Sequence, residues 1–131
     1  MTVSFEATFP SSPPGVGAMR REVAAFARRA GMDEHGLGSV KLAVSEAATN
    51  AVVHAYREAD DEAELQVRAF VEASELVVIV CDRGIGLAPR PDSPGLGLGM
   101  PLMASVTSRF RVVSAGQGTE IHMAFALPGE A

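Results

Sequence analysis

The sequence has 131 residues, a length typical of one domain, and its 11 Lys and Arg against 16 Asp and Glu give a formal net charge of −5. This acidic balance argues against a surface that attracts nucleic acid or anionic lipid. A single cysteine, Cys81, excludes an intrachain disulfide, and no apolar run longer than Leu76–Cys81 is available to cross a bilayer. With no signal-peptide pattern, we expect one soluble cytoplasmic domain over residues 1–131, with Cys81 as a buried structural thiol.

The first predicted elements are a strand and a helix. Alternation of apolar and polar residues predicts a half-buried strand over Val3–Phe9. The segment Pro10–Gly17 is rich in Pro, Ser and Gly and is expected to be a loop or a helix lead-in. A helix that ends at Gly31 should follow, because its apolar residues recur at steps of three and four: Met19, Val23, Phe26 and Ala30.

Four arginines lie off the apolar face of this first helix: Arg20, Arg21, Arg28 and Arg29. A solvated surface is the ordinary interpretation of such charges. A surface that docks another protein is the alternative, and the sequence leaves both open.

A second helix, rich in Ala, is expected from a cap at Asp33 to about Tyr56. The acidic stretch Glu58–Glu64 should be a solvent-exposed loop. Alternation over Leu65–Val71 predicts a strand, and Glu72–Glu75 should form the turn that leads into the next strand.

The strand Leu76–Cys81 is apolar throughout, so we expect a central strand covered on both faces. The following segment, Asp82–Gly99, is rich in Gly and Pro, which is typical of a functional loop in a compact domain. A short helix should run over about Met100–Thr107, and a last hairpin, Arg109–Ser114 and Thr119–Leu127, should turn at Gly116–Gly118.

The order of these elements is strand, helix, helix, strand, strand, helix, strand, strand. Because most strands are joined by hairpins, the sheet should be mixed but mostly antiparallel. The predicted fold class is α+β, a two-layer α/β sandwich in which helices cover one face of the sheet.

A stripe of polar residues on the second helix is the first candidate for function. Glu46, Asn50 and His54 stand four residues apart, so they share one face of the helix. Small neighbours such as Ala47 and Ala51 leave room for a ligand beside this stripe. Taken alone, the stripe is also compatible with an ordinary exposed polar face.

Two glycine-rich segments follow. Asp82-Arg-Gly84-Ile-Gly86 leaves the central strand, and its carboxylate could accept from an exocyclic amine while the glycines admit a flat ligand. Gly95-Leu-Gly97-Leu-Gly99-Met100 opens a helix, where successive N–H groups favour a bound phosphate. Its glycine spacing is neither that of a Walker A loop nor that of a Rossmann fingerprint.

Together these segments resemble a known family. Glu46-Ala-Ala-Thr-Asn50-Ala-Val-Val-His54, the two glycine segments and Gly118-Thr119 are similar to the N, G1, G2 and final Gly-Thr boxes of the GHKL (Bergerat-fold) ATPases and kinases. Within that superfamily, the short chain and the Glu-x-x-x-Asn-Ala-x-x-His pattern resemble the anti-sigma-factor serine/threonine kinases. The resemblance covers nearly the whole chain.

The resemblance implies a role for each matching residue. Asn50 matches a Mg²⁺ ligand, and Glu46 matches the general base that takes the proton of a serine or threonine hydroxyl. Asp82 matches the acid that binds the adenine amine, and Thr119 matches a threonine near the same base. The remaining matches line the nucleotide: His54 at the pocket edge, Gly84 and Gly86 beside the base, and Gly97, Leu98, Gly99 and Met100 around the phosphates.

The implied function is that of an ATP- and Mg²⁺-dependent protein kinase and anti-sigma factor. Such proteins hold a sigma factor inactive, phosphorylate an anti-anti-sigma protein of the STAS type, and form homodimers; they bind neither nucleic acid nor membrane directly. One departure concerns the lid: Gly95 and Leu96 stand where the family often has Arg or Ser, and Leu87–Pro94 is short and proline-rich. The alternative is therefore a non-catalytic module that sequesters a protein partner, with ATP as a structural ligand or absent. A histidine kinase fragment and a gyrase- or chaperone-like ATPase fit the sequence less well.

Overall fold

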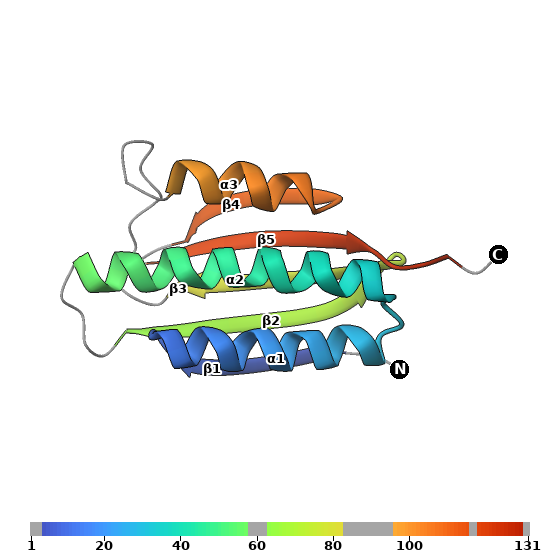
Figure 1. Cartoon of the computed structure of the whole chain (residues 1–131), viewed down its shortest axis with the longest axis horizontal. Coiled ribbons are helices and arrows are strands. Elements are labelled where there is room, and N and C mark those ends of the chain that lie inside the picture. The colour runs from blue at the N-terminus through green and yellow to red at the C-terminus, as the bar shows by residue number, and fades with distance from the viewer. Residues whose placement is uncertain (1–3, 58–62, 83–95, 116–117, 130–131) are drawn as a thin grey trace.

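The structure is a computed structural model that describes residues 4–57, 63–82, 96–115 and 118–129. A five-stranded sheet forms one layer and three helices form the other, all on the same face of the sheet (Figure 1). The elements in chain order are β1 Ser4–Pro10, α1 Pro13–Arg29, α2 Glu34–Arg57, β2 Glu64–Glu72, β3 Glu75–Asp82, α3 Leu96–Ser105, β4 Arg109–Ala115 and β5 Gly118–Ala126. The predicted α+β sandwich and its element order are confirmed. The predicted loop at residues 58–62 and most of the glycine-rich segment, residues 83–95, lie outside the described residues.

The strand order is β1-β2-β3-β5-β4, and all four pairings are antiparallel. The parallel component expected of a mixed sheet is not among these described pairs. Strand β4 does run in the same direction as β3, but β5 lies between them and pairs antiparallel with both. After β3 the chain therefore passes through α3 and skips the strand position beside β3 before it forms β4. Strand β5 then folds back from β4 and occupies that position.

Helix α1 begins at Pro13, within the segment Pro10–Gly17 that the sequence left open as a loop or a helix lead-in, and the residues from Pro13 onward belong to the helix. The Oγ of Ser12 accepts a hydrogen bond from the Gly15 N–H at 3.2 Å, and prolines occupy the first helical positions, where their missing N–H groups cost nothing. A Cβ on Gly15 would clash with the carbonyl oxygen of Pro10, so this helix start depends on glycine.

The other end of α1 follows the prediction. The last helical residue is Arg29, and Gly31 adopts a φ of 100°, a left-handed conformation that glycine accepts without strain. Helix α2 then starts where expected, because the carboxylate of Asp33 accepts from the Gly36 N–H at 2.8 Å.

The main core lies between the helices and the sheet. The predicted apolar face of α1 is buried through Met19, Val23 and Phe26, and the predicted face of the last strand is buried through Ile121, Met123 and Phe125. Between these two elements, α2 contributes a row of small side chains, of which Ala43, Ala47, Ala48 and Ala51 belong to the core. Because these residues are small, the backbone of α2 packs close to the sheet, and the polar residues beside them on α2 also lie close to the sheet.

Strand β3 is buried on both faces, as its apolar run predicted. Leu76, Val78 and Val80 face the helices, and the alternate residues join a second cluster on the other face of the sheet: Val77, Ile79, Cys81 and Ala124. Burial raises the pKa of the Cys81 thiol, and the nearby Glu120 carboxylate adds to this effect. Within the described ranges, no helix combines the length and apolar content needed to cross a lipid bilayer.

Candidate functional site

Lys41 of α2 lines a groove with α1, and Asn50 lies nine residues further on, about half a turn around the helix, so the predicted polar stripe at Asn50 is on the flank of α2 away from α1 and nearer α3 (Figure 1). Glu46 is half-buried, and Asn50, one turn further along, is only 8% exposed. His54 continues the stripe at backbone level near the end of α2, but its side chain lies outside the described residues. The stripe is thus a buried polar surface at Asn50 rather than a solvated helix face.

The amide of Asn50 is the most informative group of this stripe. Within the described part of the chain, its Nδ2 is one of two buried side-chain polar atoms without a hydrogen-bond partner, the other being the Oγ of Ser11. Leaving a buried amide N–H unpaired costs about 1–3 kcal/mol, so such a group signals a missing ligand or a functional role. The same amide also carries an oxygen that suits a hard cation such as Mg²⁺. The structure therefore fits the Mg²⁺ and nucleotide that the resemblance implied at this residue.

The sheet brings Asp82 and Thr119 together. The two residues are direct partners in the ladder between β3 and β5, although 37 positions separate them in the sequence numbering. Both share the face of Val80 and Ile121, which is the face that the helices cover. Thr119 is 6% exposed, Asp82 is half-buried, and each takes part in a polar or electrostatic interaction of the fold. A carboxylate and a hydroxyl side by side can bind a heterocycle through both a donor and an acceptor edge.

Helix α3 begins at Leu96, four residues before the predicted start at Met100. The glycines Gly97 and Gly99 therefore lie within the first turns of the helix, not before it. Helix propensity disfavours both residues, so sequence reasoning placed the start too late. The first four N–H groups of any α-helix lack partners within the helix, so this helix start, Leu96–Gly99, offers donors to an anion. The side chains of Leu98 and Met100 are outside the described residues.

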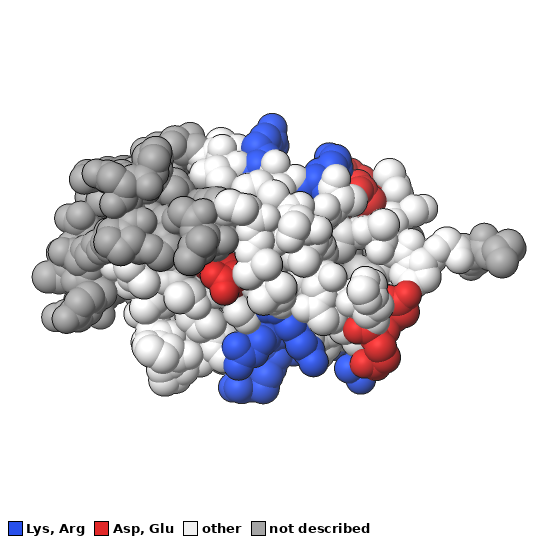
Figure 2. All heavy atoms as spheres, turned by 45° about the horizontal axis from the view of Figure 1, so that its top comes forward, with Lys and Arg blue, Asp and Glu red and all other residues white. Residues whose placement is uncertain are grey.

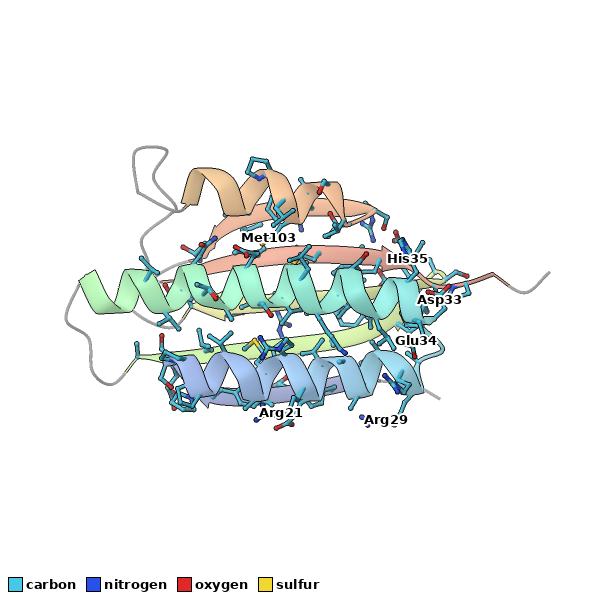
Figure 3. The ribbon with its side chains drawn as sticks, in the orientation of Figure 1. Arg21, Arg29, Asp33, Glu34, His35 and Met103 are labelled. Atoms are coloured by element: carbon cyan, nitrogen blue, oxygen red, sulfur yellow. The ribbon has the colours of Figure 1, made fainter. Side chains whose placement is uncertain are left out.

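Met103 fixes the position of α3. Its side chain is fully buried in the core shared with α2 and the sheet, and Figure 3 shows it on the side of α3 that faces those elements. Pro101 lies in the same helix, on its exposed side. The buried Met103 therefore holds α3 beside α2, and in this way it fixes the position of the helix start, Leu96–Gly99.

These parts meet at one end of the molecule. The end of α2, the end of β3 at Asp82, the start of β5 at Thr119 and the start of α3 all lie at the left in Figure 1. The antiparallel sheet explains this, because β3 ends where β5 begins, and α2 runs in the same direction as β3 in this view. Gly84 and Gly86, two further predicted site residues, lie outside the described residues.

Sequence reasoning missed one residue that the packing brings to the surface between α1 and α2. Lys41 of α2 lines a groove together with three of the predicted arginines of α1, Arg21, Arg28 and Arg29. The position of Lys41 in the sequence of α2 does not predict this location, because the location depends on how α1 and α2 pack against each other.

Three comparisons with known proteins bear on the function. A model of the histidine kinase-like ATPase domain matches residues 9–125. The anti-sigma F factor of Pasteuria penetrans is 33% identical over 130 residues, covering 90% of this chain and 87% of that protein. The serine-protein kinase RsbW of Bacillus subtilis (strain 168) is 34% identical over 140 residues, covering 95% and 86%. The crystal structure of the RsbU and RsbW domains of a Mycobacterium tuberculosis protein shares the fold, with a TM-score of 0.76 at 19% identity, over 98% of this chain and 33% of that one.

Proposed function

Because the chain belongs to the histidine kinase-like ATPase family, and within it to the anti-sigma factors and serine-protein kinases, we propose that it is an ATP-dependent serine/threonine protein kinase and anti-sigma factor. It phosphorylates an anti-anti-sigma protein and holds a sigma factor inactive. The observation that supports this proposal is that Asp82 pairs with Thr119 at the end of the sandwich where α2 ends and α3 begins, while α2 also carries the buried amide of Asn50.

The nucleotide half of the proposal assigns each group one part of ATP. Asp82 and Thr119 receive the adenine, with Gly84 and Gly86 allowing its close approach. Asn50 binds Mg²⁺, and the backbone at the start of α3, from Gly97 to Met100, binds the phosphates. His54 lies one turn beyond Asn50 and lines the edge of the pocket.

The catalytic half of the proposal rests on Glu46. Bound Mg·ATP supplies the phosphoryl group that is transferred. Glu46 stands one turn from Asn50, a spacing that puts their Cβ atoms about 6 Å apart. Its half-buried carboxylate accepts the proton of the partner's serine or threonine hydroxyl as the oxygen attacks.

A non-catalytic module that only sequesters a partner is the second candidate. The specific feature in its favour is the lid, where Gly95 and Leu96 replace the Arg or Ser that the family often has. The kinase is favoured over it because the relatives that match most of this chain include proteins named serine-protein kinase.

The test is phosphoryl transfer by the purified chain. Incubated with Mg·ATP labelled at the γ-phosphate, it should label the cognate anti-anti-sigma protein on serine or threonine, with a bond stable to acid. A partner that stays unlabelled while ATP binds and remains intact would select the non-catalytic module. Label lost in acid would instead indicate a histidine kinase.

Three further parts of the proposal follow from the family. The chain acts as one domain over residues 1–131, the anti-anti-sigma substrate is of the STAS type, and the working form is a homodimer. Because sigma factors direct RNA polymerase on chromosomal DNA, the site of action is the cytoplasm.

A further inference from the structure

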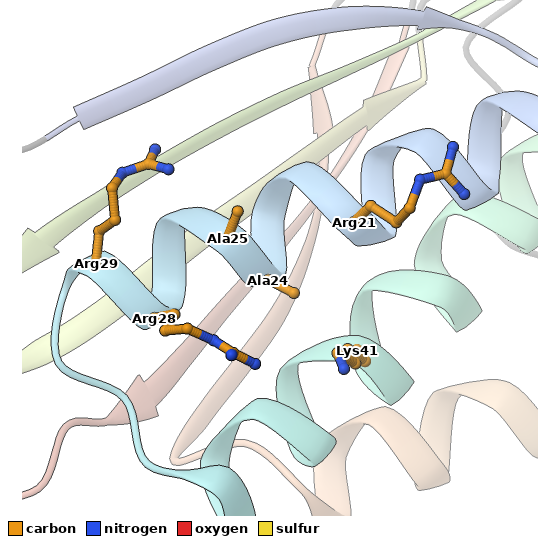
Figure 4. A pocket seen from close by; sticks show the side chains of 6 residues that line it. All are labelled: Arg21, Ala24, Ala25, Arg28, Arg29 and Lys41. Atoms are coloured by element: carbon orange, nitrogen blue, oxygen red, sulfur yellow. The ribbon is translucent and has the colours of Figure 1, made fainter.

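A groove runs between α1 and α2 on the outer surface of the helical layer, with a volume of about 550 Å³. Figure 4 shows the six side chains that line it: Arg21, Ala24, Ala25, Arg28, Arg29 and Lys41. Of the two alanines that line the groove, Ala24 is buried and Ala25 is exposed, and their small side chains leave space along α1. The four cations form the rim, and all of them are exposed.

The rim is strongly positive although the chain is acidic. Four cations lie around one groove in a chain whose formal net charge is −5. One of them, Arg28, approaches Glu34 at 3.9 Å, but both side chains are largely exposed, so this pair neutralises the groove only weakly. Among the described residues, Arg21, Arg29 and Lys41 have no carboxylate in ion-pair distance. Figure 2 shows basic side chains gathered on this lower flank of the molecule.

Local contacts hold part of the rim in place. The guanidinium of Arg29 lies over the ring of Phe26, 5.8 Å from its centroid, and that ring is buried in the core. Just beyond the groove, Arg20 donates from α1 to the Oγ of Ser45 on α2 at 3.3 Å, which links the two helices. A surface with fixed charges loses less side-chain entropy when it binds a partner.

The groove and the nucleotide site lie on opposite flanks of α2. Lys41 and Asn50 are nine residues apart, which is about half a turn around the helix axis at 100° per residue. Figure 1 shows α2 between α1 on one side and α3 on the other. A partner in the groove therefore leaves the nucleotide site open.

We propose that this groove docks an acidic amphipathic helix of the sequestered sigma factor. The helix places small apolar residues over Ala24 and Ala25 and its carboxylates against the cationic rim. Because Lys41 lies about half a turn around α2 from Asn50, the groove suits a partner that is held rather than one that is phosphorylated. The inference rests on the proposed function only in the identity of that partner.

One feature favours a protein over a nucleic acid or a lipid surface. The groove exposes apolar surface between its cations. A partner covers that surface by placing side chains in the groove, which a phosphate backbone or a headgroup layer does not provide.

The test measures the affinity of the full chain for the cognate sigma factor by isothermal titration, with three variants. Arg21→Glu reverses a rim charge, Ala25→Trp adds bulk at an exposed lining residue without changing charge, and Arg111→Glu on β4 is the matched control, also exposed and with the same charge change. We expect the two groove variants to bind on the order of tenfold or more weakly and the control to bind as the unaltered chain does. A lysine in place of an acidic residue of the partner helix should restore binding to Arg21→Glu.

Equal affinities of the groove variants and the control would overturn the inference, and so would failure of the unaltered chain to bind the sigma factor. Binding of duplex DNA or phosphatidylglycerol vesicles that Arg21→Glu abolishes would identify a different occupant and would also overturn it. Loss of phosphoryl transfer is a separate result: a chain that transfers no phosphate but still holds the sigma factor through the groove contradicts the kinase alone. Mg·ATP should stabilise all three variants as it does the unaltered chain.

Discussion

The two flanks of α2 differ in whether their polar side chains are buried or exposed. Toward α3 the helix buries the amide of Asn50 and half-buries Glu46, with alanines beside them. Toward α1 it exposes Lys41, which lines a groove with Arg21, Arg28 and Arg29 of α1. Buried polar groups without partners are costly and specify one ligand geometry, whereas exposed charges cost little and act over a longer range. One helix thus combines a flank suited to chemistry with a flank suited to docking.

The largest expected effect comes from removing the base on the α3-facing flank. Glu46→Ala should lower the rate of phosphoryl transfer by about 10²–10⁴-fold, the usual contribution of general base catalysis, and leave ATP affinity nearly unchanged. Single-turnover transfer from labelled ATP measures this. Lys41→Ala on the other flank should transfer at the unaltered rate when the partner is saturating. Normal transfer by Glu46→Ala would refute the assignment of the base.

A smaller effect is expected at the end of β3. Asp82→Asn should weaken ATP binding by about tenfold to a hundredfold, because a hydrogen bond to a charged group contributes about 1.5–3 kcal/mol. The loss should be greater for ATP than for GTP, which lacks the exocyclic amine at that position of the ring. Glu120→Gln, on the other face of the sheet, is the control. Equal losses for both nucleotides would mean that Asp82 does not contact the base.

The smallest effect is expected at the N-terminal cap of α1, which contributes to the stability of the whole fold. Ser12→Ala should destabilise the protein by about 1 kcal/mol, because the Gly15 N–H at the start of α1 loses its capping acceptor. Urea denaturation measures the change. Both ATP affinity and sigma-factor affinity should stay unchanged in the folded protein. A selective loss of sigma-factor binding would show that the start of α1 itself belongs to the docking surface.

Residue patterns predicted most of the helices and strands and their buried faces. The period of two along β5 and the steps of three and four along α1 identified the buried faces, and a single apolar run identified β3 as the central strand. The starts of α1 and α3 were harder to predict. Pro13 and Gly97 belong to residue types that usually interrupt helices, yet at a first turn Pro lacks only an N–H that is unpaired anyway.

The site was predictable in its members but not in its arrangement. Alternation within a strand cannot show that Asp82 pairs with Thr119, because register is set by the neighbouring strand. The burial of Asn50 likewise depends on α3 and the sheet closing around α2. Lys41 entered the groove only through helix packing, which no single helix pattern contains.

The most direct test of the central claim is a thermal denaturation series with Mg·ATP, comparing the unaltered chain, Asn50→Ala and the control Thr49→Ala, an exposed neighbour on α2. At a nucleotide concentration 100-fold above the dissociation constant, the unaltered chain and Thr49→Ala should each gain about 2.7 kcal/mol of stability, and the gain should require Mg²⁺. Asn50→Ala should lose the part of the gain that depends on Mg²⁺. An Asn50→Ala protein that Mg·ATP stabilises as much as the unaltered chain would contradict the proposal that Asn50 binds the metal at the nucleotide site.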